Sequence, residues 1–308
     1  MWRPPLGGPF TSSGSRTLYP ACYTRSMPPI DIDARVIANA RLSSEYSVLS
    51  LAAPEVGART EPGQFVMVKP AGVTDPLLRR PFSIFEVLRD AQGAITGVSI
   101  LNKRAGRSTR RLYELEVGDV VSCLGPLGQP FRPVSSPTRA WLVAGGVGLA
   151  PFATLAEALA KSQTDTTLFY GARTGEELFY LDFFERLGAT LVLTTENGAR
   201  GTKGRVTLPL EAALQALGAG DTAMVYACGP EPMLAAVAKL AARYQQPSQV
   251  SVERVMGCGL GGCYSCVVPV KRRDDLSSEA PGAKEEHAHL VRSCISGPVF
   301  DGAELVWD

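Results

Sequence analysis

Four of the seven cysteines lie in the last quarter of the chain, at a spacing that suits an iron–sulfur cluster. Cys258, Cys263 and Cys266 form the pattern C-x4-C-x2-C, and Cys294 follows after 27 residues. Plant-type [2Fe–2S] sites use this ligand spacing, with three thiolates from one tight loop and a fourth from a distant segment. The sequence therefore predicts a [2Fe–2S] cluster held by these four cysteines.

Two other interpretations of the same cysteines remain open. A four-cysteine zinc site has the same ligands but usually pairs them as two C-x2–4-C units, whereas here they divide three and one. A disulfide framework is typical of secreted chains with an even number of cysteines, and this chain has an odd number. Glycines at 257, 259, 261 and 262 favour the cluster, because its loop must bring backbone amides close to the inorganic sulfides.

A second group of residues could hold the phosphates and ring of a flavin. Arg80, Pro81, Phe82 and Ser83 follow an expected strand at 65–69. The guanidinium fork suits a phosphate, and a serine can hydrogen-bond a ring nitrogen. Taken alone, such an arginine on a strand is more often solvated or paired with a carboxylate.

A third segment, residues 101–109, runs from a strand into a glycine-containing turn. It includes Leu101, Asn102, Lys103, Ser108 and Thr109, and its hydroxyls and free amides could hold a pyrophosphate. An ordinary basic hairpin is the alternative, since five lysines and arginines crowd 103–111. Spacing alone does not separate the two.

Two short motifs could bind a nucleotide. Gly145, Gly146 and Gly148 lie between an apolar strand and a helix start, where free amides and the helix dipole attract a pyrophosphate. Cys228, Gly229 and Pro230 follow another apolar strand, and ligands of open α/β sheets gather beyond such strand ends. Neither motif is the G-x-G-x-x-G fingerprint, and a single buried cysteine is usually a small apolar filler.

The elements that must position these residues change character along the chain. Short strands rich in β-branched and aromatic residues, separated by Gly and Pro turns, favour an antiparallel barrel or sandwich over 28–135; they are expected at 46–51, 65–69, 82–87, 98–101 and 120–124. Apolar strands alternating with helices favour a doubly wound parallel sheet over 136–247; the strands are expected at 140–144, 167–170, 190–194 and 223–227, and the helices at 151–162, 177–187, 208–217 and 232–244. Residues 248–308 form a small cysteine-bearing domain with a polar excursion at 271–286.

Composition excludes several classes of protein. Lys plus Arg (31) nearly balances Asp plus Glu (30), which gives no reason to expect a nucleic acid or a membrane surface as partner. No apolar run approaches the ~18 residues of a membrane helix. Residues 1–27 lack acidic residues and are rich in Pro, Gly and Ser, so we expect a disordered or over-extended tail, with a transit peptide as the alternative.

Together these motifs resemble the ferredoxin–NADP reductase superfamily. In chain order they are PGQF at 62–65, RPFS at 80–83, GPLG at 125–128, GGVGLAP at 145–151 and CGP at 228–230. With the cysteine pattern and the CISGPVF sequence at 294–300, the chain is similar to electron-transfer subunits of NAD-linked dihydroorotate dehydrogenases. The resemblance covers about residues 30–308.

The resemblance implies an antiparallel FAD-binding barrel, a doubly wound NAD domain and a small C-terminal [2Fe–2S] domain. By matched position, FAD would be lined by Arg80, Pro81, Phe82 and Ser83 and by the segment that holds Leu101, Asn102, Lys103, Ser108 and Thr109. The chain departs from the family at three positions: Ser108 replaces a glycine, Asn102 an aromatic residue, and Ser296 an acidic residue beside the fourth cysteine.

The function implied by the resemblance is an electron relay in pyrimidine biosynthesis. Bound FMN in a partner catalytic subunit would oxidise dihydroorotate, and electrons would pass through the cluster and FAD to NAD⁺. No catalytic acid–base residue is expected in this chain. The resemblance also implies a cytoplasmic heterotetramer with two copies of each chain. The same cofactors would also suit a sulfhydrogenase or an electron-bifurcating transhydrogenase. NADPH is not excluded, because Arg173 follows a strand of the nucleotide domain, although acidic residues nearby disfavour a 2′-phosphate.

Overall fold

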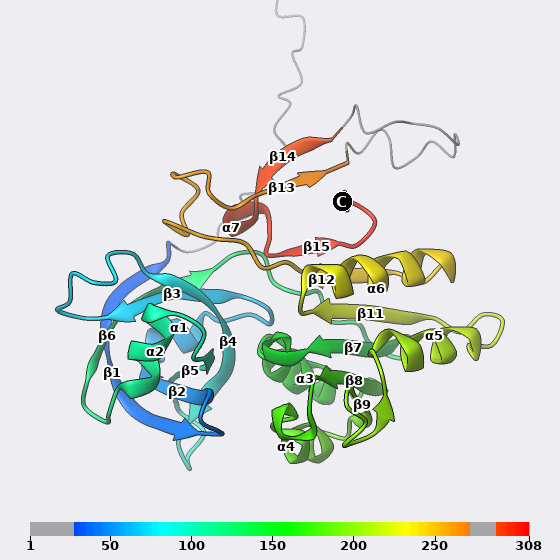
Figure 1. Ribbon diagram of the computed structural model, residues 1–308, viewed down its shortest axis with the longest axis horizontal. Helices are drawn as coiled ribbons and strands as arrows, with labels where there is room; N and C mark the ends of the chain where they lie inside the picture. Colours follow the sequence, from blue (N-terminus) through cyan, green and yellow to red (C-terminus); the bar gives the residue numbers. More distant parts are fainter. Residues whose placement is uncertain (1–27, 272–287, 308) are drawn as a thin grey trace, which may run out of the picture.

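The computed structural model describes residues 28–271 and 288–307 of the 308-residue chain. These residues form a barrel, a mixed α/β sheet beside it, and a small cysteine-bearing unit above both (Figure 1). The expected tail at 1–27 and nearly all of the polar excursion at 271–286 lie outside the described residues.

The N-terminal unit is a closed antiparallel barrel with strand order β1-β2-β5-β4-β3-β6. Its strands are β1 (Ile30–Arg41), β2 (Tyr46–Ala52), β3 (Phe65–Pro70), β4 (Arg80–Arg89), β5 (Ile95–Lys103) and β6 (Val120–Leu127). Two short helices, α1 (Pro54–Ala58) and α2 (Arg107–Glu114), lie against it. The predicted barrel is therefore confirmed.

Strand β3 is buried on both of its faces. Val66 and Val68 point into the barrel core with other aliphatic side chains. Phe65 and Met67 face outward and pack against the cysteine-bearing unit. Because side chains alternate along a strand, an antiparallel strand with four consecutive buried apolar residues, at 65–68, must be covered on its outer face as well.

The segment after β5 forms a helix, not the hairpin that its basic residues also allowed. The Thr109 hydroxyl accepts hydrogen bonds from the Ala105 and Gly106 amides at 3.0 and 2.9 Å, which fixes the start of α2. At its other end, the Asn39 amide of β1 donates to carbonyls of residues 112, 113 and 115. These last bonds satisfy carbonyls that a helix end leaves without partners.

The second unit is a seven-stranded sheet of order β10-β9-β8-β7-β11-β12-β15. Its strands are β7 (Arg139–Gly145), β8 (Thr166–Ala172), β9 (Thr190–Thr195), β10 (Thr202–Lys203), β11 (Ala223–Cys228), β12 (Ser248–Ser251) and β15 (Val299–Asp301). Its helices are η1 (Gly146–Leu149), α3 (Phe152–Lys161), η2 (Gly175–Glu177), α4 (Leu181–Arg186), α5 (Thr207–Gln215) and α6 (Glu231–Arg243). All pairs are parallel except β12 with β15. The chain moves outward from β7 in one direction and then resumes at β11 on its other side, so the doubly wound prediction is confirmed.

The helix predicted at 177–187 begins later than expected. A short turn, η2, comes first, and Tyr180 then adopts a left-handed conformation with φ of 58° before α4 starts at Leu181. The Tyr180 ring packs edge-on against Phe85 of the barrel, with ring centroids 4.6 Å apart. The contact holds the nucleotide-side sheet against β4.

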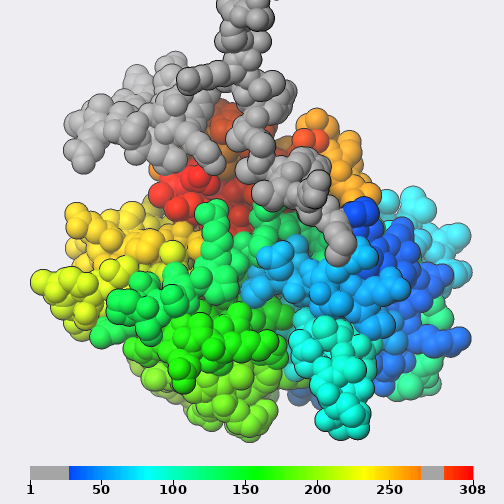
Figure 2. Space-filling view, turned by 180° about the vertical axis from the view of Figure 1, so that it is seen from behind, coloured from blue at the N-terminus to red at the C-terminus, as the bar shows by residue number. Residues whose placement is uncertain are grey.

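The cysteine-bearing unit lies on top of both other units, as the red and orange atoms show (Figure 2). Strand β13 (Val267–Val270) pairs with β14 (His289–Arg292), and the short helix α7 (Ser293–Ser296) leads into β15. Because β12 and β15 both belong to the seven-stranded sheet, the expected boundary at 247/248 falls at the start of one of that sheet's strands.

Candidate functional site

The four predicted cluster ligands come together above the barrel, in two pairs. Cys258 lies close enough to Cys263 to influence its thiol, and Cys266 stands in the same relation to Cys294. The first pair faces outward, with Cys263 exposed and Cys258 half-buried, whereas the second pair is buried. The ligand set therefore has an outer end and an inner end.

One thiol at each end, Cys263 outside and Cys294 inside, has a shifted pKa, and the two shifts are opposite in direction. Hydrogen bonds from Ser265, whose hydroxyl lies 3.1 Å from the sulfur, and from Cys258 lower the pKa of Cys263 to about 6. Burial, and the nearby Cys266 sulfur, raise the pKa of Cys294 to about 12. Iron binding requires thiolates, and a bound metal supplies the positive charge that keeps a buried sulfur deprotonated.

This arrangement suits a two-iron cluster better than a single zinc ion. Zinc would need four sulfurs around one point, but within 28–271 and 288–307 no three His, Cys, Asp or Glu side chains gather around one position. A [2Fe–2S] cluster needs only two thiolates at each iron, which matches the two pairs. Gly259 and Gly261, with φ of 73° and 78°, allow the loop to fold tightly around the site.

Contacts far apart in the sequence hold the ligand segments in place. Gln129, just after β6, donates from its backbone to the Gly297 carbonyl (2.6 Å) and from its side chain to the Ile295 carbonyl (3.0 Å). Arg292 donates to the Gly261 carbonyl at 2.8 Å, which joins β14 to the loop of the first three cysteines. Sequence reasoning missed Gln129 and Arg292, although Gln129 directly follows the GPLG motif at 125–128.

The predicted flavin residues of β4 lie beside the outer face of β3. Ser83 is paired with Phe65, and Pro81 with Met67. One guanidinium nitrogen of Arg80 donates to the Leu78 and Arg79 carbonyls, at 3.0 and 3.2 Å. It takes part in none of the ion pairs formed among the described residues. Its remaining N–H groups are thus suited to a phosphate.

The second predicted flavin segment brings the end of β5 against the start of α2. Leu101 is buried, and Asn102 is fully buried and donates to the Thr109 carbonyl at 3.0 Å. Lys103 lies over the Tyr46 ring, and Ser108 is buried in the first turn of α2. Asn102 and Thr109 therefore fix the turn, while the first backbone amides of α2 are the groups free to meet a pyrophosphate.

The two predicted nucleotide motifs meet at the carboxyl ends of β7 and β11. A Cβ atom on Gly148 would stand 2.2 Å from the Cys228 carbonyl oxygen, so the two turns are in direct contact. Gly146 has a φ of 55° and open space where a side chain would project. Gly229 and Pro230 lie across from Gly145. The winding of the sheet reverses between β7 and β11, and nucleotides bind at such a crevice.

Cys228 is half-buried, and burial raises the pKa of its thiol to about 12. It is therefore a neutral thiol at neutral pH.

Arg173 is the residue that kept NADPH, with its 2′-phosphate, as an alternative to NADH. It donates to both Glu177 carboxylate oxygens, at 2.5 and 3.3 Å. With its guanidinium engaged by Glu177, Arg173 gives little support for NADPH.

Substituting Gly148 with alanine tests the contact between the two nucleotide motifs. The new methyl group would collide with the Cys228 carbonyl, and overpacking of this kind costs about 1–3 kcal/mol. We expect the KM for NADH to rise while the bound cluster and flavin stay unchanged, as measured by steady-state kinetics and absorbance. Gly218→Ala is the control, because its Cβ would meet only the Asp221 side chain, at an ordinary contact distance of 3.4 Å, and its backbone is not left-handed. An unchanged KM would contradict the assignment.

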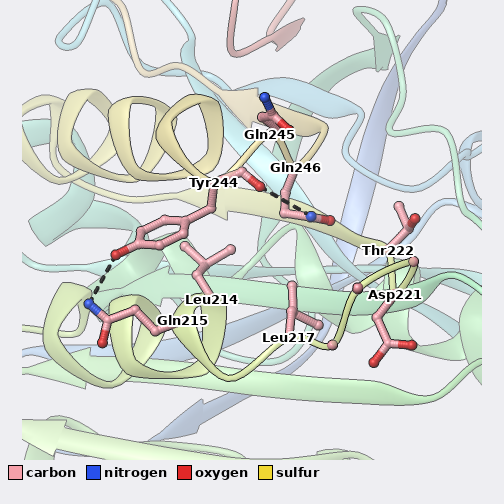
Figure 3. Close-up of a pocket in the computed structure, with 11 residues that line it drawn as sticks. Leu214, Gln215, Leu217, Asp221, Thr222, Tyr244, Gln245 and Gln246 are labelled. Carbon is pink, nitrogen blue, oxygen red and sulfur yellow. Dashed lines mark hydrogen bonds between the residues drawn. The ribbon is translucent and has the colours of Figure 1, made fainter.

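A hollow of about 650 Å³ lies elsewhere, between the ends of α5 and α6 (Figure 3). Gln215 donates to the Tyr244 hydroxyl at 3.0 Å across it, and Gln246 donates to the Tyr244 carbonyl at 3.2 Å. The hollow borders Thr222, just before β11, and so lies at the amino end of that strand. The crevice between β7 and β11 lies at the other, carboxyl ends of these strands, so the hollow is not part of the nucleotide site.

Two family models match the chain. An oxidoreductase NAD-binding domain covers residues 142–239, and an iron–sulfur cluster binding domain of dihydroorotate dehydrogenase B covers 253–306. The chain is 33% identical over 276 residues to the dihydroorotate dehydrogenase B (NAD(+)) electron transfer subunit of Desulforamulus reducens, covering 90% of this chain and 98% of that one. It is 38% identical over 274 residues to the same subunit of Bacillus caldolyticus, covering 88% and 96%.

Solved structures show the same architecture. One, described as an NADH-dependent reduced ferredoxin-NADP oxidoreductase with flavin-based electron bifurcation, is 26% identical with a TM-score of 0.73, covering 89% of this chain and 90% of that one. A ferredoxin reductase of carbazole 1,9a-dioxygenase, 23% identical with a TM-score of 0.61 over 72% and 68%, shares the fold. Over the described ranges, no helix is long and apolar enough to cross a membrane.

Proposed function

Because the chain belongs to the family of dihydroorotate dehydrogenase B (NAD(+)) electron transfer subunits, we propose that it carries electrons from a dihydroorotate-oxidising partner to NAD⁺. The net reaction is dihydroorotate plus NAD⁺ giving orotate, NADH and a proton. The observation that carries the proposal is the gathering of four cysteines in two pairs, of which the inner pair packs against the barrel strand beside Arg80–Ser83.

FAD, a [2Fe–2S] cluster and NAD are the cofactors of this relay. When bound, the cluster handles single electrons and FAD handles pairs, which allows exchange with the two-electron carrier NAD⁺. The residues of this chain would bind and orient these cofactors. Arg80 and the amides of α2 would hold the FAD phosphates, Ser83 would face the ring, and the turns at Gly146 and Gly229 would hold NAD. Cys258, Cys263, Cys266 and Cys294 would hold the irons.

The partner is proposed to be an FMN-containing catalytic subunit, in a heterotetramer with two copies of each chain. Supporting this, the cysteine-bearing unit carries large apolar side chains that are more than half exposed, on and just before the loop of the first three cysteines and on β14: Val255, Leu260, Tyr264 and Leu290. Exposed apolar groups gathered in this way mark an interaction surface. We place the complex in the cytoplasm, since the described cysteines are free thiols of a kind kept reduced there.

The proposal is tested by mixing the purified chain with a candidate FMN subunit and dihydroorotate. NADH formation that depends on both chains, with orotate as product, is the expected result. The isolated chain should contain about two irons and two labile sulfides and a flavin band that NADH bleaches. Stoichiometric zinc without labile sulfide would refute the proposal. Orotate formation without NADH formation when the chain is added would refute it as well.

A second candidate is the flavin subunit of an electron-bifurcating enzyme, which the 26% identical structure favours. The curated relatives at 33–38% identity and the cluster-domain match favour dihydroorotate oxidation. Reduction of the chain by dihydroorotate through the partner, without ferredoxin, separates the two.

A further inference from the structure

We propose that the cluster is oriented, with its Cys266–Cys294 end toward the flavin, and that the Met67 side chain is the bridge across which electrons pass. The inference rests on the proposed function, since it takes the [2Fe–2S] cluster and FAD as the occupants of their sites. It adds a direction to the cluster and a positioning residue outside the predicted ligands.

The inner cysteine pair belongs to one buried cluster of side chains with the barrel wall. Cys266 and Cys294 pack there with Met67 and with residues of the same wall and the cysteine loop, namely Phe65, Leu124, Leu127 and Met256. Met67 is fully buried, and a Cβ atom on Gly259 would lie 2.7 Å from its Cγ and 3.3 Å from its sulfur. The cysteine loop thus rests directly on this methionine.

The same methionine adjoins the predicted flavin strand. Met67 on β3 is paired with Pro81 on β4, and Phe65 with Ser83. Directly opposed residues of antiparallel strands project from the same face of the sheet. The outward face that contacts Cys266 and Cys294 therefore continues, one strand away, into the Arg80–Ser83 segment. Phe65 and Met67 are both shared by the two sites, and Met67 is the one on which the cysteine loop also rests. Its thioether is polarisable and adapts closely to its neighbours.

The outer cysteine pair lies outside this buried cluster of side chains, with Cys263 exposed and Cys258 half-buried. Electrons from a docked partner would enter at this end and leave at the inner end. Each crossing of Met67 oxidises the cluster by one electron and reduces the flavin by one. Two crossings, with one proton from solvent, supply the hydride equivalent that NAD⁺ takes up; with NADH as donor, the same path runs in reverse.

The test uses the purified chain loaded with FAD and cluster, and NADH as reductant under anaerobic rapid mixing. In Met67→Ala we expect flavin bleaching at the wild-type rate and cluster reduction, followed by electron paramagnetic resonance, slowed several-fold. FAD content, iron content and cluster midpoint potential should be unchanged, since a gap lengthens the path without altering either redox group. Met67→Leu, which nearly conserves volume, should retain most of the rate.

Val66→Ala is the matched control, because Val66 is equally buried on the same strand but faces the barrel core. It should lower thermal stability without slowing cluster reduction. If Met67→Ala loses the cluster, Met67→Val removes less volume and should give intermediate slowing. Unslowed cluster reduction in the loaded Met67 variants, or equal slowing in Val66→Ala, overturns the inference. The test contains neither dihydroorotate nor a partner, so its result does not depend on the partner assignment. A chain that binds no FAD would instead contradict the proposed function itself.

Discussion

Replacing Cys294 with alanine is expected to remove iron and labile sulfide from the chain while NADH still bleaches its flavin. Cys294 provides half of the inner ligand pair, with Cys266, and its segment is tied to the barrel through Gln129. An iron left with one protein thiolate has an incomplete tetrahedron, so the cluster should not assemble. Iron and sulfide analysis should fall from about two of each per chain to near zero, and transfer of electrons from the partner to NAD⁺ should stop.

Cys123→Ala provides a control of the same chemistry. Cys123 is fully buried in the barrel core, where burial raises the pKa of its thiol to about 12, and it lies among aliphatic side chains. This variant should keep the cluster and lose some thermal stability through the small cavity. A Cys294→Ala protein that retained both irons would show that the ligand set has been misassigned.

Arg80→Ala is expected to weaken FAD binding by about ten- to a hundred-fold, since a hydrogen bond to a charged group contributes about 1.5–3 kcal/mol. The reason is the free part of the guanidinium, which is engaged on one side only by two backbone carbonyls. The FAD dissociation constant, measured by flavin fluorescence of the stripped and reloaded protein, checks the prediction. Iron content should not change, because among the described residues the Arg80 side chain donates only to the Leu78 and Arg79 carbonyls.

Arg79→Ala is the neighbouring control. Arg79 pairs with Asp31 and donates to the Ser122 hydroxyl on adjacent strands of the barrel. Its loss should cost barrel stability and leave FAD affinity close to wild type. If the two variants bound FAD equally weakly, a general loosening of the barrel, and not a phosphate contact at Arg80, would explain the result.

The strands were the part of the fold most open to prediction from sequence, because β-branched residues bounded by Gly and Pro carry their own local signal. The five barrel strands expected were found with modest extensions. Helix α2 was not predicted. Its basic sequence after Gly106 also suits a turn, and the cap on its last carbonyls comes from Asn39, more than 70 residues away.

The same distinction holds at the site. The spacing of the cysteines predicted the ligand set, since a cluster loop imposes a local constraint on the chain. The division into an outer and an inner pair depends on which side of the loop the barrel covers. One signal of that cover was present in β3, where Phe65 and Met67 are apolar on the face that a barrel would otherwise expose to water. Gln129 carried no comparable signal, because its partners are backbone carbonyls of α7 and its surroundings.

Strands β12 and β15 are antiparallel neighbours, with Ser251 opposite Val299, and the Val252 amide donates to the Pro298 carbonyl at 2.9 Å. In topological terms the cysteine-bearing unit is therefore the loop of one long hairpin at the edge of the nucleotide sheet. Both ends of such an insertion leave from adjacent points of the sheet, so the insertion does not interrupt the order of the sheet's own strands. The barrel and the sheet would therefore keep their strand order if a short turn joined β12 to β15, but the outer face of β3 would lose its cover.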